Sequence, residues 1–200
     1  KELVDRLRKS AQGFVDFAAF SLQAFGDLVL KNQAYVDTIL ADHYAHRTNY
    51  MGMVDANGKV SFYRGQVRVV DPAGKTFLEF APADYLTHIA EHVEAWSYIK
   101  FPFLKTLGWK GFVDGPETSL YRVAPLARLN VADGMATPRA QEHYEQMYQT
   151  LGGKPVHNTL ATHWARLIEA LQAAETVHVL ADDPEILSPV VRTLPIEAPT

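Results

Sequence analysis

The nearest approach to a catalytic motif in this sequence is His88-x-x-Glu91-His92. In a helix, His88 and His92 share a face one turn apart, and Glu91 could act as the general base toward a zinc-bound water. Such a site needs a third protein ligand, which Glu169 in the last predicted helix could supply. The pattern therefore predicts a zinc-dependent hydrolase. The alternative, which we favour, is an exposed helical face with two ordinary histidines.

The remaining polar groups have simpler structural explanations. His43 and His46, close to Asp42, are predicted near a helix C-terminus, where the helix dipole favours histidine. His163, beside Trp164, fits a half-buried and hydrogen-bonded position on a helix. No G-x-S-x-G motif and no phosphate-binding glycine pattern is present. From local motifs we assign no catalytic, cofactor-binding or metal-binding residue.

Composition excludes several classes of protein. The 200 residues include 19 Lys and Arg, 23 Asp and Glu, and no Cys, for a net charge of −4. A mildly acidic chain lacks the clustered cations that nucleic-acid binding needs. Without cysteine there are no disulfides, thiolate zinc sites or iron–sulfur ligands, and we expect a cytoplasmic location. No apolar run approaches the roughly 20 residues of a membrane span, so we expect no membrane contact.

Hydrophobic periodicity predicts the elements that must position these residues. Residues 1–48 are predicted to be helical, with a break at Lys31-Asn32. Their predicted buried stripe consists of Leu3, Leu7, Phe14, Ala18, Leu22, Phe25 and Val29. Residues 49–80 alternate and contain Asn57-Gly58 and Asp71-Pro72-Ala73-Gly74, which predict antiparallel hairpins.

The second half is predicted to be mostly helical. We expect a helix over 83–94, an irregular aromatic segment over 95–136, two helices over 137–181 and an extended tail over 182–200. The predicted fold is α+β, mostly α-helical with a small antiparallel β-hairpin insert around residues 50–80, in a single domain spanning 1–200.

Two longer strings resemble a known family. Lys100-Phe101-Pro102-Phe103 and the decapeptide from Tyr121 to Asn130 closely resemble the K-F-P-Y and Y-R-V-G-P-L-A-R-L-N segments of the large subunit of nickel–iron hydrogenases. Phe103 stands where that family has Tyr, and Ala124 where it has Gly. Residues 131–138, 163–169 and 182–186 extend the resemblance. It is greatest to the cytoplasmic methyl-viologen-reducing, heterodisulfide-reductase-linked type, and next to the NAD-reducing bidirectional type.

The resemblance implies reversible oxidation of dihydrogen at a nickel–iron centre with carbonyl and cyanide ligands. It also implies that an iron–sulfur small subunit receives the electrons, with heterodisulfide reductase or diaphorase subunits as further partners. In that family two C-x-x-C motifs hold the centre, and this chain has neither, so no catalytic residue is carried over. The family signature Leu126-Ala127-Arg128 receives no role.

We therefore expect an internal, structural and inactive piece of a large subunit, with no cofactor of its own. The start at Lys1 and the proline-spaced end favour such a piece. Its aromatic stretch 96–121 is expected to cause self-association in isolation, because large exposed apolar patches tend to become covered. The zinc-dependent hydrolase and a non-catalytic interaction module are the alternatives.

Overall fold

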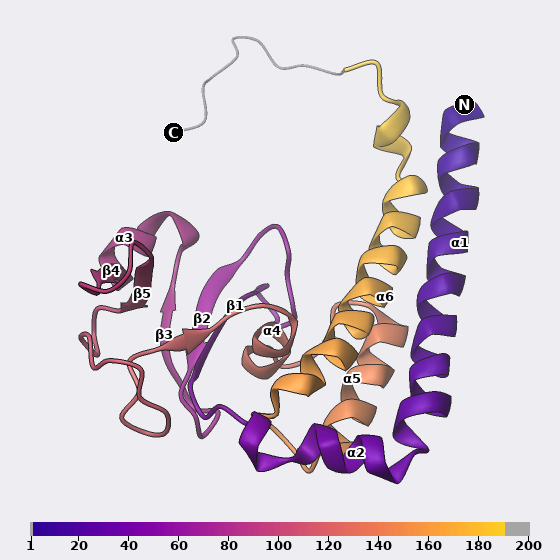
Figure 1. Cartoon of the computed structure of the whole chain (residues 1–200). Helices are drawn as coiled ribbons and strands as arrows, with labels where there is room; N and C mark the ends of the chain where they lie inside the picture. The colour runs from indigo at the N-terminus through magenta and orange to yellow at the C-terminus, as the bar shows by residue number, and fades with distance from the viewer. Residues whose placement is uncertain (1, 191–200) are drawn as a thin grey trace.

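The computed structural model describes residues 2–190 and confirms the predicted α+β class. Four of the helices, α1, α2, α5 and α6, lie on one side of the molecule, and the strands lie on the other together with the short helix α3 (Figure 1). The helices are α1 (Glu2–Phe25), α2 (Gln33–Leu40), α3 (Tyr85–His88), α4 (Pro125–Val131), α5 (Pro138–Thr150) and α6 (Thr162–Ala181). The strands are β1 (Asn49–Val54), β2 (Gln66–Val70), β3 (Thr76–Phe80), β4 (Ile89–Val93), β5 (Lys100–Leu104) and β6 (Tyr121–Arg122).

The larger sheet has the strand order β3-β2-β1-β6. Strands β1, β2 and β3 pair antiparallel, in the segment where the turn residues predicted hairpins. Strand β6 is an addition that the sequence did not reveal: it pairs parallel to β1, with Tyr121 opposite Asn49 and Arg122 opposite Tyr50. The decapeptide that contains Arg122 is therefore anchored directly on the central strand.

The helix predicted over 83–94 is wrong. Helix α3 ends at His88, and the backbone of Ile89–Val93 continues as strand β4, paired antiparallel with β5. Over a run this short, apolar spacing cannot distinguish helix from strand. The β-branched Ile89 and Val93 favour the extended form, and the pairing with Lys100–Leu104 selects it.

The segment 95–136 is also more ordered than predicted. It contains β5, β6 and helix α4, so it is not irregular throughout. In the tail, Pro184–Leu187 forms a 3-10 turn that is capped by Asp183, whose side chain accepts from the Glu185 N–H, a correction to the extended prediction. Residues 191–200, the rest of the predicted tail, lie outside the described residues.

The first helical segment breaks where predicted. A π-helical turn, Gly26–Leu30, ends α1, and the Asn32 side chain caps α2 by accepting from the Ala34 N–H at 3.1 Å. Helix α2 ends at Leu40, because Ala41 leaves the helical conformation with ψ 127°.

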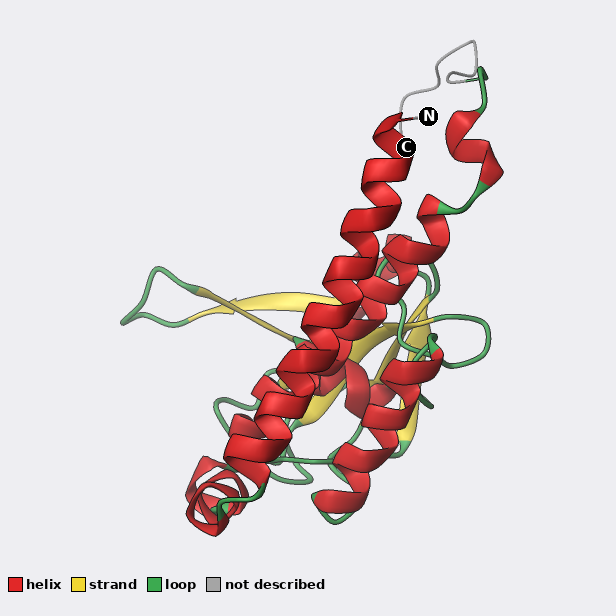
Figure 2. Cartoon of the chain, turned by 90° about the vertical axis from the view of Figure 1, so that its right-hand side faces the viewer, coloured by secondary structure: helices red, strands yellow, loops and turns green. Residues whose placement is uncertain are grey.

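The long helix α1 packs against α6 through a stripe that matches the predicted one only in part, at Ala18 and Leu22. Its buried residues are Val4, Ala11, Val15, Ala18 and Leu22. Leu3, Leu7 and Phe14 are exposed instead. Helix α1 is apolar on more than one face, so periodicity alone could not identify the buried one. Figure 2, viewed from the helical side, shows α1 as the outermost helix.

One helix in the described part of the chain, Glu2–Leu30, is long and apolar enough to cross a membrane by length and composition. This corrects the expectation that no segment approaches that length. Core helices of soluble proteins and signal sequences meet the same criteria.

Candidate functional site

The three residues of the H-x-x-E-H pattern do not converge. The His88 ring stacks on Phe80, with centroids 4.3 Å apart, and the His92 ring stacks on Trp109, also at 4.3 Å. Glu91 and His92 are successive residues of strand β4, so their side chains point to opposite faces. Each residue is therefore held in its own environment.

Glu91 and His92 also have different polar partners. The Glu91 carboxylate pairs with Lys100 across the ribbon at 2.9 Å, and His92 Nε2 lies 3.1 Å from Glu94 Oε1. Glu169, the expected third ligand, is engaged elsewhere. Residues 2–190, as far as they are described, contain no group of three His, Asp or Glu side chains that could hold a metal ion. The zinc-hydrolase prediction is therefore wrong, because its premise was a helix that the chain does not form.

Glu169 instead joins two helices through Arg128. The guanidinium donates from Nε and Nη2 to the two carboxylate oxygens, each at 2.7 Å. The Glu169 side chain is 8% exposed, and the Arg128 guanidinium also lies 5.8 Å from the centre of the Phe62 ring. Leu126-Ala127-Arg128 belongs to helix α4, with Leu126 and Ala127 buried. The structure thus assigns the signature a packing role at the α4–α6 junction.

Ala124 begins this junction with an unusual backbone. Its φ of 78° and ψ of −176° lie in a region that glycine adopts readily and other residues avoid. The Ala124 carbonyl nevertheless accepts the first helical hydrogen bond, from Arg128 N at 3.1 Å. The resembling family has glycine at this position, so alanine here places a side chain on a backbone shaped for glycine.

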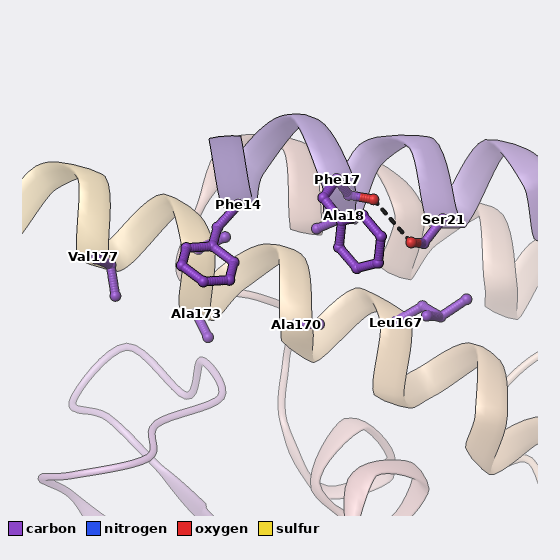
Figure 3. A pocket seen from close by; sticks show the side chains of 9 residues that line it. Phe14, Phe17, Ala18, Ser21, Leu167, Ala170, Ala173 and Val177 are labelled. Carbon is purple, nitrogen blue, oxygen red and sulfur yellow. Dashed lines mark hydrogen bonds between the residues drawn. The ribbon is translucent and has the colours of Figure 1, made fainter. Parts of the chain in front are cut away.

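An apolar groove of about 420 Å³ runs between α1 and α6 (Figure 3). Phe14 and Phe17 of α1 lie opposite Leu167 and Val177 of α6. The Ser21 hydroxyl donates to the Phe17 carbonyl at 2.8 Å, so it offers little to a ligand. The groove suits a hydrophobic group, and it lacks the polar side chains that would carry chemistry.

A second cleft, of about 700 Å³, is lined by both polar and aromatic side chains. They come from five separate parts of the chain, within residues 46–48, 101–102, 112–114 and 120–122 and at 159. Here His46 Nδ1 lies 3.3 Å from Asp114 Oδ2. A 3-10 helix, Asp42–Tyr44, has His43 in its last turn, and His46 lies two residues beyond its end, so both histidines lie near a helix end as predicted, although not that of α2.

Arg122 holds three parts of this cleft together. Its guanidinium donates to the carbonyls of His46 and His157, at 3.4 and 3.0 Å, and to the Thr159 hydroxyl at 3.3 Å. The Tyr50 hydroxyl oxygen lies 2.6 Å from His157 Nδ1. Burial raises the pKa of Tyr50 to about 12, and burial together with the nearby Arg47 and Arg122 lowers the pKa of His157. Both shifts favour the neutral forms of the two side chains.

The loop that carries Asp114 is fastened to the central strand. Asn49 is buried on β1 and donates from Nδ2 to the carbonyls of Thr118 and Leu120, at 3.1 and 2.9 Å. Sequence reasoning missed Thr48, Asp114 and Arg122 as members of one cleft. The signal for this cleft in the sequence was the Tyr121-Arg122 string, and the partners of Arg122 are 35 to 76 residues away. His163 is exposed, so the prediction that it is half-buried is wrong, whereas its neighbour Trp164 is buried.

Comparison with known proteins places the chain beside hydrogenase subunits. No family model matches the sequence. Curated relatives nevertheless align over most of it, and they are subunits of F420-non-reducing and NAD-reducing hydrogenases.

Three relatives illustrate the similarity. The chain is 50% identical over 182 residues to an iron-sulfur subunit of the F420-non-reducing hydrogenase of Archaeoglobus profundus, which is 91% of this chain and 37% of the relative. It is 40% identical over 177 residues to the NAD-reducing hydrogenase HoxS subunit beta of Cupriavidus necator, or 88% of this chain and 34% of that one. In a crystal structure of an NAD+-reducing [NiFe]-hydrogenase in the H2-reduced state, 39% of one chain matches 93% of this chain, with a TM-score of 0.79 and 28% identity.

These names correct the predicted identity of the subunit. The F420-non-reducing relatives share one subunit designation, and the one from Archaeoglobus profundus is named an iron-sulfur subunit. The prediction of a nickel-binding large subunit is therefore wrong, while the resemblance to hydrogenases stands. The chain spans little more than a third of the length of the curated relatives it matches.

Proposed function

We propose that this chain is a structural segment of the iron-sulfur-named subunit type of F420-non-reducing hydrogenases, and so part of an oxidoreductase. Identity of 50% over 182 residues to such a subunit carries the proposal. The shared fold, with a TM-score of 0.79 over 93% of the chain, supports it independently. The oxidation or production of dihydrogen belongs to the complete enzyme in this proposal, and we propose a cytoplasmic location for it.

The segment does not fit a role as ligand shell for a redox centre. Iron–sulfur clusters and nickel–iron centres are held by cysteine thiolates, and the sequence contains none. His88 and His92 each stack on an aromatic ring, and the described residues contain no group of three side chains that could hold a metal ion. We therefore derive no catalytic step from these residues and propose that they position neighbouring protein.

Two apolar surfaces support an assembled state. Phe14, Phe17 and Phe20 on α1 are each more than 60% exposed. On the β4–β5 side, Trp96 and Tyr98 are 71% and 96% exposed. Large exposed apolar patches usually mark contacts with other protein. We propose that the remainder of such a subunit, or other subunits of the hydrogenase, cover them. The expected partnership with a separate iron–sulfur small subunit no longer follows, because the Archaeoglobus profundus relative itself has the iron-sulfur name.

A segment exchange tests this proposal. The matching 37% of the Archaeoglobus profundus relative is replaced by this chain, and hydrogen-dependent dye reduction is measured in the assembled enzyme. We expect the chimera to assemble and to retain activity within about tenfold of the parent. The same chimera carrying Trp164→Asp, a charge in a position that is 2% exposed, should fail to assemble.

Separate expression gives a second measure. The isolated 200-residue chain should show no hydrogenase activity and should self-associate in sedimentation velocity. Phe17→Glu or Trp96→Glu should reduce that association without unfolding the chain, since both side chains are exposed. An inactive chimera that nevertheless assembles like the parent would contradict the proposal.

A further inference from the structure

Arg122 has no carboxylate partner within the described residues. Its guanidinium donates to two carbonyls and a hydroxyl, and no carboxylate among those residues lies within ion-pair distance of it. Asp114, the carboxylate of the cleft, faces His46 instead. A half-buried cation without an anion favours binding of one.

Thr48 gives a second, independent indication. It lines the cleft, it is 5% exposed, and its Oγ1 is buried without a hydrogen-bond partner among the described residues. A buried hydroxyl without a partner is unfavourable, and native proteins rarely keep one without a reason. A ligand oxygen that entered beside Arg122 would supply the missing acceptor.

The apolar residues that line the same cleft indicate what the anion is attached to. Phe101, Pro102 and Phe112 contribute to the lining, and the Phe101 and Phe112 rings meet edge to face with centroids 4.9 Å apart. A bare inorganic ion would leave these side chains without a partner. A planar or apolar group carrying one negative charge suits both the apolar and the polar lining residues.

We infer that this cleft binds a carboxylate carried on an apolar group, with Arg122 and Thr48 as its polar contacts. The Arg122 hydrogen bonds to the His46 and His157 carbonyls and to the Thr159 hydroxyl are made by Nη1 and Nη2. Asp114, 50% exposed at the side of the cleft, disfavours a doubly charged phosphate more than a monoanion. The same chemistry occurs in a free aromatic acid and in the C-terminus of a polypeptide.

Titration of the whole 200-residue chain, followed by amide chemical shifts, tests the inference. The probes are benzoate, N-acetyl-phenylalanine, N-acetyl-phenylalanine amide and inorganic phosphate. We expect saturable shifts at the cleft for the two carboxylates, no saturation for the neutral amide, and at least tenfold weaker binding of phosphate. Benzoate bound as tightly as N-acetyl-phenylalanine would identify a small free acid as the ligand. A tenfold advantage of N-acetyl-phenylalanine would identify a polypeptide terminus.

Variants localise the effect. Arg122→Gln should weaken carboxylate binding at least tenfold. Thr48→Val should weaken it three- to tenfold, while the amide chemical shifts outside the cleft stay those of the folded parent protein. Arg64→Gln removes an exposed cation outside the cleft and should leave binding unchanged. Because Arg122→Gln also removes backbone contacts, Thr48→Val provides the separate measure if that variant unfolds. Equal binding of the amide, or unchanged affinity in Thr48→Val, would overturn the inference.

Discussion

Ala124→Gly is expected to stabilise the protein, against the usual effect of introducing glycine. At φ 78° and ψ −176°, a non-glycine residue costs about 1–3 kcal/mol. Glycine removes that strain but loses about 0.5–1 kcal/mol through the greater freedom of the unfolded chain. Ala124 is exposed, so its methyl group contributes little burial. The free energy of unfolding should therefore rise by about 0.5–2 kcal/mol.

Urea titration followed by circular dichroism measures this change, and the thermal midpoint checks it. For a chain of this size, about 1 kcal/mol corresponds to roughly 2–4 °C. Ala132→Gly is the matched control. Ala132 is fully buried with an ordinary φ of −87°, so glycine there should cost about 1–2 kcal/mol. If Ala124→Gly lowered stability as Ala132→Gly does, backbone strain at this junction would be refuted.

Three further predictions concern paired and buried charges. Arg128→Met should destabilise the chain by about 3–5 kcal/mol, because it leaves the Glu169 carboxylate buried without its cation. Adding Glu169→Leu should recover much of that loss. Urea titration of the two single variants and the double variant completes the double-mutant cycle that measures this. Burial against Tyr144 and Tyr148 lowers the pKa of Lys154 to about 8. Between pH 8 and 10 the unfolded state therefore binds more protons than the folded state, so the free energy of unfolding should rise with pH over that window. The rise should be seen in the parent protein and not in Lys154→Met. The pKa of His157 is also lowered, so on acidification the unfolded state takes up a proton at this side chain before the folded state does. The free energy of unfolding should therefore fall as the pH drops below about 6.5. Urea midpoints measured from pH 7 to 5 should show this fall in the parent protein and not in His157→Gln.

The fold was largely accessible to sequence reasoning where long or well-marked patterns exist. The Asn57-Gly58 turn joins extended chain, and Asn32 begins α2, because both act through local backbone chemistry. Strand β4 was not accessible, since five residues carry too little periodicity and pairing with Lys100–Leu104 decided the outcome. The stripe on α1 was predicted only in part, at Ala18 and Leu22, for a different reason: the helix is apolar around much of its circumference, and packing against α6 selects the face.

The candidate cleft could not be predicted, because it is assembled by tertiary structure. Parallel pairing of β6 with β1 brings Arg122 beside Tyr50, and the loop after β5 brings Asp114 to His46. None of these contacts joins residues that are separated in the sequence by the short, regular spacing of a helix or a strand. The motif that sequence reasoning did single out, His88-x-x-Glu91-His92, depended on a helical geometry that the chain does not adopt.

Asn49 links the fold to the cleft, because it fastens the loop that holds Asp114 to the central strand. Asn49→Ala removes two hydrogen bonds and leaves the carbonyls of Thr118 and Leu120 without their donor. We expect a loss of about 2–4 kcal/mol. We also expect faster amide exchange confined to the loop of residues 105–120, since β1 keeps its pairing with β2. Asn57→Ala, at an exposed turn, is the control and should change neither. Uniformly faster exchange across the whole chain would show that Asn49 supports the sheet itself, and the argument that it positions the loop would then fail.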